Sequence, residues 1–175
     1  MKPTQAFIFS TILLLSTSSM FAQYPGWQQK ANYNMEITVD TDLHQYDGKM
    51  DVLYENNSPD DLNKVFFYAF FNAFQPGSMM DVRSRNISDP DSRVGSRISE
   101  LPEEEWGWIK DVNLTMDGEP CIVTIEETIL VVDLPTPIVS GSYANFQMSW
   151  KAQVPRQIRR SGWMNKEGIE LSMTQ

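Results

Sequence analysis

Residues 143–154 alternate between apolar and polar side chains, and this pattern constrains the fold more than any other stretch of the sequence. A repeat of two over eleven residues predicts a long β-strand with one buried face. Pro155 then ends the strand, because proline has no backbone N–H to donate to a neighbour. The apolar side is formed by Ala144, Phe146, Met148, Trp150, Ala152 and Val154, and the polar side by Asn145, Gln147, Ser149, Lys151 and Gln153.

Strand signals recur along the rest of the chain. Segments 33–39, 49–55, 108–116, 121–126 and 128–134 are predicted strands, and Asp117-Gly118 marks a tight hairpin turn. Segment 65–71 is apolar on both faces, which predicts a central strand covered on both sides. Residues 72–107 lack sustained alternation, and short helical turns are predicted near 79–83 and 102–106. About eight strands with short connections predict an all-β, saddle-like antiparallel β-sandwich with one long irregular loop region.

The first residues of the sequence predict a cleavable signal helix. Lys2 precedes an apolar run from Ala6 to Leu15, and small residues lead to a cleavage position after Ala22. The apolar run is shorter than the about 20 residues that a bilayer requires. We therefore expect residues 1–22 to be a signal peptide. We expect residues 23–175 to form one exported domain that is periplasmic, on the cell surface or secreted, with no membrane span after signal removal.

The charge balance excludes two classes of partner. The whole chain has a net charge of −9, and removal of Lys2 with the signal peptide leaves 13 basic against 23 acidic side chains, or −10. Nucleic acids and anionic lipid head groups bind through clustered Lys and Arg. We therefore expect no nucleic-acid partner and no binding to anionic membrane surfaces.

The residues needed for hydrolytic chemistry are scarce. A catalytic zinc ion needs three protein ligands, and this sequence has one histidine, His44, and one cysteine, Cys121. It also has no His-Glu-x-x-His, Gly-x-Ser-x-Gly or phosphate-binding glycine loop. We predict no catalytic residue, no metal ligand and no cofactor within this chain.

The aspartates at 40, 42, 47 and 51 are interpreted as a solvated acidic face, with calcium binding as the alternative. Paired carboxylates for glycoside hydrolysis stay open, because their separation cannot be read from the sequence.

A basic run follows the long strand. Arg156, Arg159 and Arg160 lie within seven residues of an otherwise acidic chain. Guanidinium groups pair well with carboxylates, which favours structural or interdomain ion pairs for all three, with ligand binding as the alternative. Alternation resumes with Ile169, Leu171 and Met173 and stops at Gln175, which predicts a chain cut short inside a strand.

Several stretches resemble the N-terminal domain of exported zinc metallopeptidases of the aminopeptidase N family, in the form found in Bacteroidetes-type bacteria. The resemblance covers residues 27–175, and the runs at 70–85 and 153–175 are the most specific to it. They read Phe70-Phe-Asn-Ala-Phe-Gln-Pro-Gly-Ser-Met-Met-Asp-Val-Arg-Ser-Arg85 and Gln153-Val-Pro-Arg-Gln-Ile-Arg-Arg-Ser-Gly162, followed by Glu167-Gly-Ile-Glu-Leu-Ser-Met-Thr-Gln175.

The resemblance implies a fold and a role. In that family the N-terminal domain is a saddle-like β-sandwich that caps a thermolysin-like catalytic domain, and the catalytic domain holds the zinc. Gln175 matches a family glutamine that enters the substrate pocket, so the resemblance implies a substrate-binding role for it. The family's zinc ligands match nothing in this sequence.

Two functional hypotheses follow. The first is a non-catalytic N-terminal domain, present as a fragment, of a zinc-dependent aminopeptidase that removes N-terminal residues from peptides. Its partner is a missing catalytic domain, in cis or as a separate chain, and zinc belongs to that parent. The alternative is a stand-alone secreted β-sandwich that binds a peptide, a glycan or a surface protein. The first hypothesis predicts poor solubility of the isolated chain, because the interdomain face is left bare.

Overall fold

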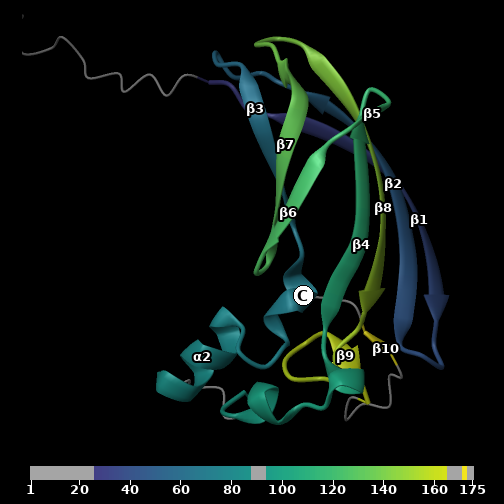
Figure 1. Cartoon of the computed structure of the whole chain (residues 1–175), viewed down its shortest axis with the longest axis vertical. Coiled ribbons are helices and arrows are strands. Elements are labelled where there is room, and N and C mark those ends of the chain that lie inside the picture. The colour runs from purple at the N-terminus through teal and green to yellow at the C-terminus, as the bar shows by residue number, and fades with distance from the viewer. Residues whose placement is uncertain (1–25, 88–93, 165–170, 173–175) are drawn as a thin grey trace, which may run out of the picture.

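The computed structural model describes residues 26–87, 94–164 and 171–172. Two antiparallel sheets face each other across an apolar core, and a lobe of short helices lies at one end of them (Figure 1). The larger sheet has five strands in the order β1-β2-β8-β4-β5. Its strands are β1 (Lys30–Asp40), β2 (Gln45–Glu55), β8 (Tyr143–Gln153), β4 (Trp108–Met116) and β5 (Glu119–Pro120).

The second sheet has three strands in the order β3-β7-β6, and two short strands form a separate ribbon. The three are β3 (Leu62–Tyr68), β7 (Ile129–Ile138) and β6 (Ile122–Glu126), and the ribbon pairs β9 (Gly162–Trp163) with β10 (Leu171–Ser172). The predicted all-β sandwich is confirmed. The predicted signal peptide, residues 1–22, lies outside the described residues.

The long alternating segment is the centre of the larger sheet. β8 pairs with β2 along its whole length, and on its other side it pairs with β4. Phe146 is 1% exposed and meets the rings of Tyr54 and Phe67 edge to face, with centroids 6.3 and 6.1 Å away. Because these rings come from both sheets, Phe146 joins the two layers of the sandwich.

Segment 65–71 differs from its prediction as a central strand covered on both sides. β3 ends at Tyr68, and residues Phe70–Ala73 form a short 3-10 helix, η1. β3 is also an edge strand of the smaller sheet. On its outer face Phe66 is 65% exposed, and Tyr68, where the strand ends, is 69% exposed. A run that is apolar on both sides is typical of a covered strand, and here its second face stays open instead.

The lobe contains α2 (Met79–Asn86) and the 3-10 helices η2 (Arg97–Glu100) and η3 (Glu103–Glu105). These elements confirm the two predicted helical turns. The lobe has its own core, in which Val94, Ile98 and Ile158 are at most 1% exposed. Two loop segments far apart in the sequence are therefore held together by packing rather than by a sheet.

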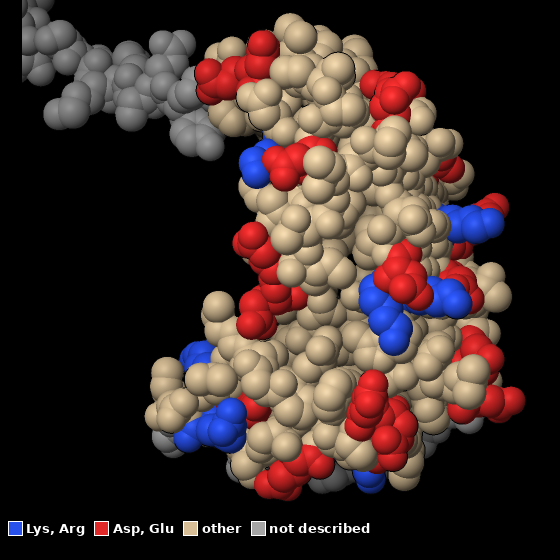
Figure 2. Space-filling model, viewed as in Figure 1, with Lys and Arg blue, Asp and Glu red and all other residues tan. Residues whose placement is uncertain are grey.

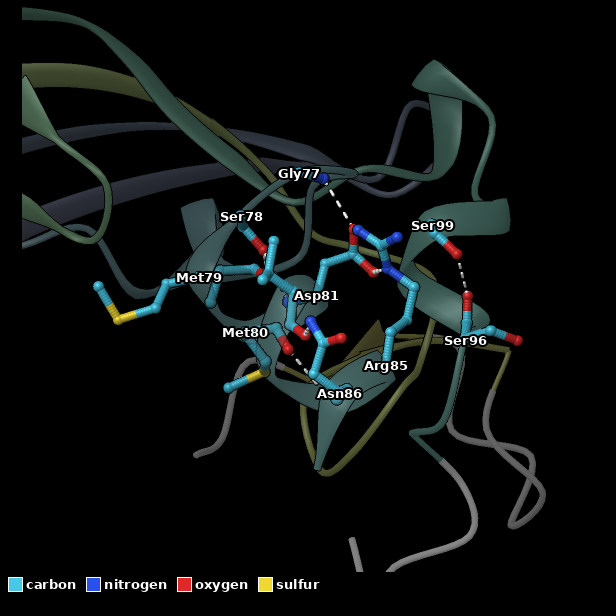
Figure 3. Close-up of polar contacts among 12 residues, drawn as sticks. Gly77, Ser78, Met79, Met80, Asp81, Arg85, Asn86, Ser96 and Ser99 are labelled. Carbon is cyan, nitrogen blue, oxygen red and sulfur yellow. Dashed lines mark hydrogen bonds and ion pairs between the residues drawn. The ribbon is translucent and has the colours of Figure 1, made fainter. Parts of the chain in front are cut away.

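Asp81 fixes the start of α2 (Figure 3). Its carboxylate is fully buried, accepts a hydrogen bond from the Gly77 amide at 2.8 Å and pairs with Arg85 at 3.0 Å. The Ser78 hydroxyl accepts from the Asp81 amide at 3.2 Å, which caps the helix. One aspartate thus connects the turn, the cap and the first two turns of the helix.

We expect Asp81→Ala to lower the free energy of unfolding by about 2 kcal/mol, because it removes three charge-assisted hydrogen bonds, two from Arg85 and one from the Gly77 amide, and leaves that amide without its acceptor. Urea denaturation followed by tryptophan fluorescence measures the change. The matched control is Glu104→Ala, which removes an exposed carboxylate from the first turn of η3 and is expected to change stability by less than about 0.5 kcal/mol. Equal effects of the two variants would contradict this role of Asp81.

Candidate functional site

The inner face of the larger sheet continues beyond the smaller sheet that covers it. Residues directly opposite each other in an antiparallel pair lie on the same face. Met148, Met50 and Met35 are opposite one another in β8, β2 and β1, and their exposures are 9%, 6% and 52%. The row therefore begins at a buried residue, Met148, and ends at an exposed one, Met35.

The apolar row of β1 is exposed along its length. Tyr33, Met35, Ile37 and Val39 are 41% to 56% exposed, although the same sheet face is buried two strands away. The sequence predicts a strand with one wet face here, whereas the structure leaves both faces of β1 accessible. We call this exposed row, together with the cleft described next, the open inner face.

An apolar cleft of about 420 Å³ lies between the exposed row of β1 and the end of β3. Its lining carries no charged side chain, and aromatic rings dominate it. Figure 2 shows uncharged surface through the middle of the molecule, with most charged side chains around it. Six of the aromatic lining residues are Tyr33, Tyr46, Tyr68, Phe70, Phe71 and Trp150.

The floor of the cleft depends on a glycine. A Cβ atom at Gly48 would lie 2.2 Å from Cζ2 of Trp150, so the indole lies directly over the glycine backbone. Burial raises the pKa of the Tyr46 hydroxyl, and a hydrogen bond with the Trp150 side chain partly offsets that shift. Tyr46 also meets Phe71 edge to face at 6.3 Å. The floor is thus a packed aromatic layer in which the side chains of Tyr46 and Trp150 are hydrogen-bonded to each other.

The ribbon β9-β10 is attached to the same layer. Phe71, Ala152 and Val154 form a small core cluster, and Tyr46, Trp150 and Leu171 pack against it. Leu171 belongs to β10, and the two aromatic residues line the cleft. The described part of the last strand therefore lies next to the cleft. Gln175, the predicted substrate-binding residue, lies outside the described residues.

The basic run makes contacts within the chain. The Arg156 guanidinium pairs with Glu105 at 2.7 Å and lies 5.8 Å from the Trp163 ring. The His44 ring stacks on the Trp163 ring, and the two ring centroids are 4.1 Å apart. Arg159 is partly buried, and Arg160 is exposed in the turn that follows. Arg156 is therefore in an ion pair within the chain, and an interdomain role of the three arginines stays a prediction.

The acidic residues serve turns and strands. The Asp40 carboxylate accepts from the amides of Asp42 and Leu43, both at 3.0 Å, and Asp51 accepts from the Gln147 side chain at 3.1 Å. Within residues 26–87, 94–164 and 171–172, no three His, Cys, Asp or Glu side chains gather as a possible metal site. No helix in these ranges has the length and apolar character that crossing a membrane requires.

The cleft was not predicted from the sequence. The sequence features that contribute to it are the alternating apolar residues of β1 and the two consecutive phenylalanines, Phe70 and Phe71. Alternation shows which side chains share a face, but it does not show how far the second sheet extends over that face. That the apolar residues of β1 are exposed follows only from the order in which the strands pair.

Comparisons with known proteins give a weak likeness. No family model matches the sequence, and no curated protein matches it. Two solved structures of a mutant M1 zinc metallopeptidase from Deinococcus radiodurans are similar in fold, one of them bound to a Tyr-Ser-Ala substrate. For each the TM-score is 0.45 at 11% identity, over 78% of this chain and 24% of the other chain. The chain thus spans about a quarter of the length of those proteins, and a likeness of this size assigns no family.

Proposed function

We propose that residues 23–175 form the exported, non-catalytic N-terminal domain of a zinc-dependent aminopeptidase, and that the open inner face docks on a catalytic domain outside this sequence. The family assignment is supported by the sequence resemblance over residues 27–175. The docking role is supported by one structural observation, the open inner face itself.

The chemistry of this face suits a permanent partner. Single exposed apolar residues are ordinary, but a continuous row beside an uncharged cleft is typical of an interaction surface. Aromatic residues and methionine are enriched at protein interfaces, and lysine and glutamate are depleted there. Tyr33, Met35, Phe70 and Trp150 have this composition, and the charged residues of the chain lie outside the cleft lining. Covering these side chains would therefore bury apolar area without stranding a charge.

In this proposal the roles are divided between two domains. The catalytic domain supplies the zinc ion and the general base that activate water for attack on the first peptide bond. The present chain walls the substrate pocket, and Gln175 contributes a polar group to it, as the resemblance implies. The described part of the last strand supports this role, because Leu171 packs against the small core cluster beneath the floor of the cleft.

The rival function is a stand-alone secreted binding module. The aromatic lining of the cleft favours it, because tyrosine and tryptophan rings bind peptide side chains and sugar faces in concave sites. The two functions differ in what they require. The module binds its ligand alone, whereas the aminopeptidase domain has no activity without a second polypeptide unit.

The test is to co-express the chain with a His-Glu-x-x-His catalytic domain encoded in the same genome and to measure zinc-dependent cleavage of aminoacyl anilides. We expect a stable complex and activity only when both parts are present. Phe70→Lys should weaken the complex at least roughly tenfold, because it places a charge in the cleft. Ile122→Lys is the matched control, since Ile122 is 71% exposed on β6, away from the cleft.

Two outcomes would overturn the proposal. One is hydrolysis by the chain alone. The other is a catalytic domain that is equally stable and active without the chain. Saturable binding of a peptide or glycan by the isolated chain, lost in Phe70→Lys and kept in Ile122→Lys, would establish the rival function instead.

A further inference from the structure

β1 is a long, regular edge strand. It pairs with β2 through all eleven residues without a register shift, and the five-stranded sheet ends at β1. Figure 1 shows it as the outermost strand of the sheet. An edge strand presents a row of backbone N–H and C=O groups that another strand can pair with. β1 contains neither proline nor glycine, so nothing in its sequence blocks such pairing.

The other edges of the two sheets lack one or more of these properties. β5 has two residues and ends in Pro120, and β4 behind it carries an irregularity between Lys110 and Asn113. β3 has a register shift between Leu62 and Lys64, and β6 has only five residues. Short strands, prolines and bulges are the usual means by which proteins prevent edge pairing. Among the edge strands that the structure describes, β1 alone has none of them.

The sequence of β1 is complementary to itself when read antiparallel. Only one register pairs all eleven residues, and it places Met35 opposite Met35 of a second copy. In this register Lys30 lies opposite Asp40, and every apolar residue lies opposite an apolar residue. The remaining pairs are Ala31 with Val39, Asn32 with Thr38, Tyr33 with Ile37, and Asn34 with Glu36.

The side chains at the two ends of β1 are placed for this pairing. Lys30 is 62% exposed and lies 3.5 Å from Glu55 on the outer face of the sheet. Asp40 is on the same face, and both of its backbone contacts use Oδ1. Opposite charges on directly opposed positions stabilise a strand pair, and like charges destabilise it. The full-length register therefore gains one favourable charge pair at each end.

We propose that two copies of this chain associate through β1, antiparallel about a twofold axis at Met35, so that their larger sheets join into one continuous sheet. The pairing adds about ten backbone hydrogen bonds. It also extends the inner-face row of methionines across the axis and covers part of the exposed row of β1. A twofold axis through an edge strand closes the assembly at two copies, because each chain has one such edge.

Disulfide formation tests both the pairing and its register. Directly opposite residues have Cα atoms about 4.5 to 5.5 Å apart, which a disulfide can bridge. With Cys121→Ser as background, we expect Met35→Cys to give a covalent dimer on mild oxidation. Tyr33→Cys alone should not, because the two copies of residue 33 would lie roughly 13 Å apart along the strands. A mixture of Tyr33→Cys and Ile37→Cys chains should cross-link.

Ile122→Cys is the control for accidental collision, since its side chain is as accessible on another edge strand. Sedimentation velocity of the unmodified full chain should show a dimer that dissociates on dilution, and Met35→Lys should weaken it roughly tenfold, because two lysines would meet on the axis. Ile122→Lys should leave the dimer intact. A monomer at all concentrations, or cross-linking of Tyr33→Cys or Ile122→Cys as efficient as that of Met35→Cys, would overturn the proposal. These experiments measure self-association of the chain without any catalytic domain, so failure here is distinct from failure of the proposed function.

Discussion

Phe146→Ala is expected to lower the free energy of unfolding by about 4 kcal/mol, the largest loss of any single truncation considered for this chain. Phe146 is 1% exposed in the central strand, opposite Val52 on one side and Met116 on the other. Its ring also meets Phe67 of the smaller sheet. The truncation therefore opens a cavity between two rigid sheets that cannot close around it, so both the transfer energy and the packing contacts are lost.

Urea denaturation measures this change, and the five tryptophans report on it by fluorescence. Phe66→Ala is the matched control, because Phe66 is the same residue type but 65% exposed on the outer face of β3. Its expected cost is below about 1 kcal/mol. A similar loss for both variants would contradict the prediction and would indicate that the outer face of β3 is covered in solution.

The strands whose pattern is local were predicted well from the sequence. The alternation at 143–154 corresponds to β8 at Tyr143–Gln153, and the strand at 108–116 and the Asp117-Gly118 turn are observed as predicted. Alternation of apolar and polar residues predicts a strand with one buried face, and Asp-Gly predicts a turn with positive φ angles. Both patterns lie within a few neighbouring residues, so they can be recognised in the sequence. The helical turn predicted near 79–83 is observed as α2, and its N-cap, Ser78, is likewise a local feature that lies next to the helix in the sequence.

Features that depend on distant segments were missed or misread. Segment 65–71 was interpreted as covered on both sides because it is apolar throughout, yet the chain supplies no layer for its outer face among the described residues. The lobe core joins Ile98 to Ile158, and no periodic signal relates two loops that far apart. The cleft is a similar case, because its lining comes from both sheets and from η1.

The arginine run shows the same limit for the candidate site. Composition favoured structural or interdomain ion pairs for Arg156, Arg159 and Arg160, because acidic side chains outnumber basic ones by 23 to 14 and guanidinium groups pair well with carboxylates. It could not choose Glu105 as the partner of Arg156, which depends on the position of η3 beside the end of β8. The pair is partly exposed, so its net contribution to stability is expected to be about 1 kcal/mol or less. The pair joins η3 of the lobe to the segment that follows β8.

Gly48→Ala is expected to lower the free energy of unfolding by about 2 kcal/mol and to disturb the cleft. The added methyl group would lie 2.2 Å from the Trp150 ring, which is packed between Tyr46 and the small cluster beneath the cleft. A rigid indole cannot yield by rotating a terminal atom, so the whole ring must leave its position. Near-UV circular dichroism should report the displaced tryptophan, and urea denaturation the lost stability.

A double-mutant cycle identifies the cause, since alanine by itself is not unfavourable relative to glycine inside a strand. Trp150→Leu removes the ring that the methyl group strikes. In that background we expect Gly48→Ala to cost less than about 0.5 kcal/mol, so the two substitutions should be strongly non-additive. An equal cost of Gly48→Ala with and without the indole would show that backbone strain, rather than the position of Trp150, requires glycine there. The floor of the cleft would then not depend on the pairing of Gly48 with Trp150, and the aromatic layer beneath the open inner face would have to be held by Tyr46 and Phe71 instead.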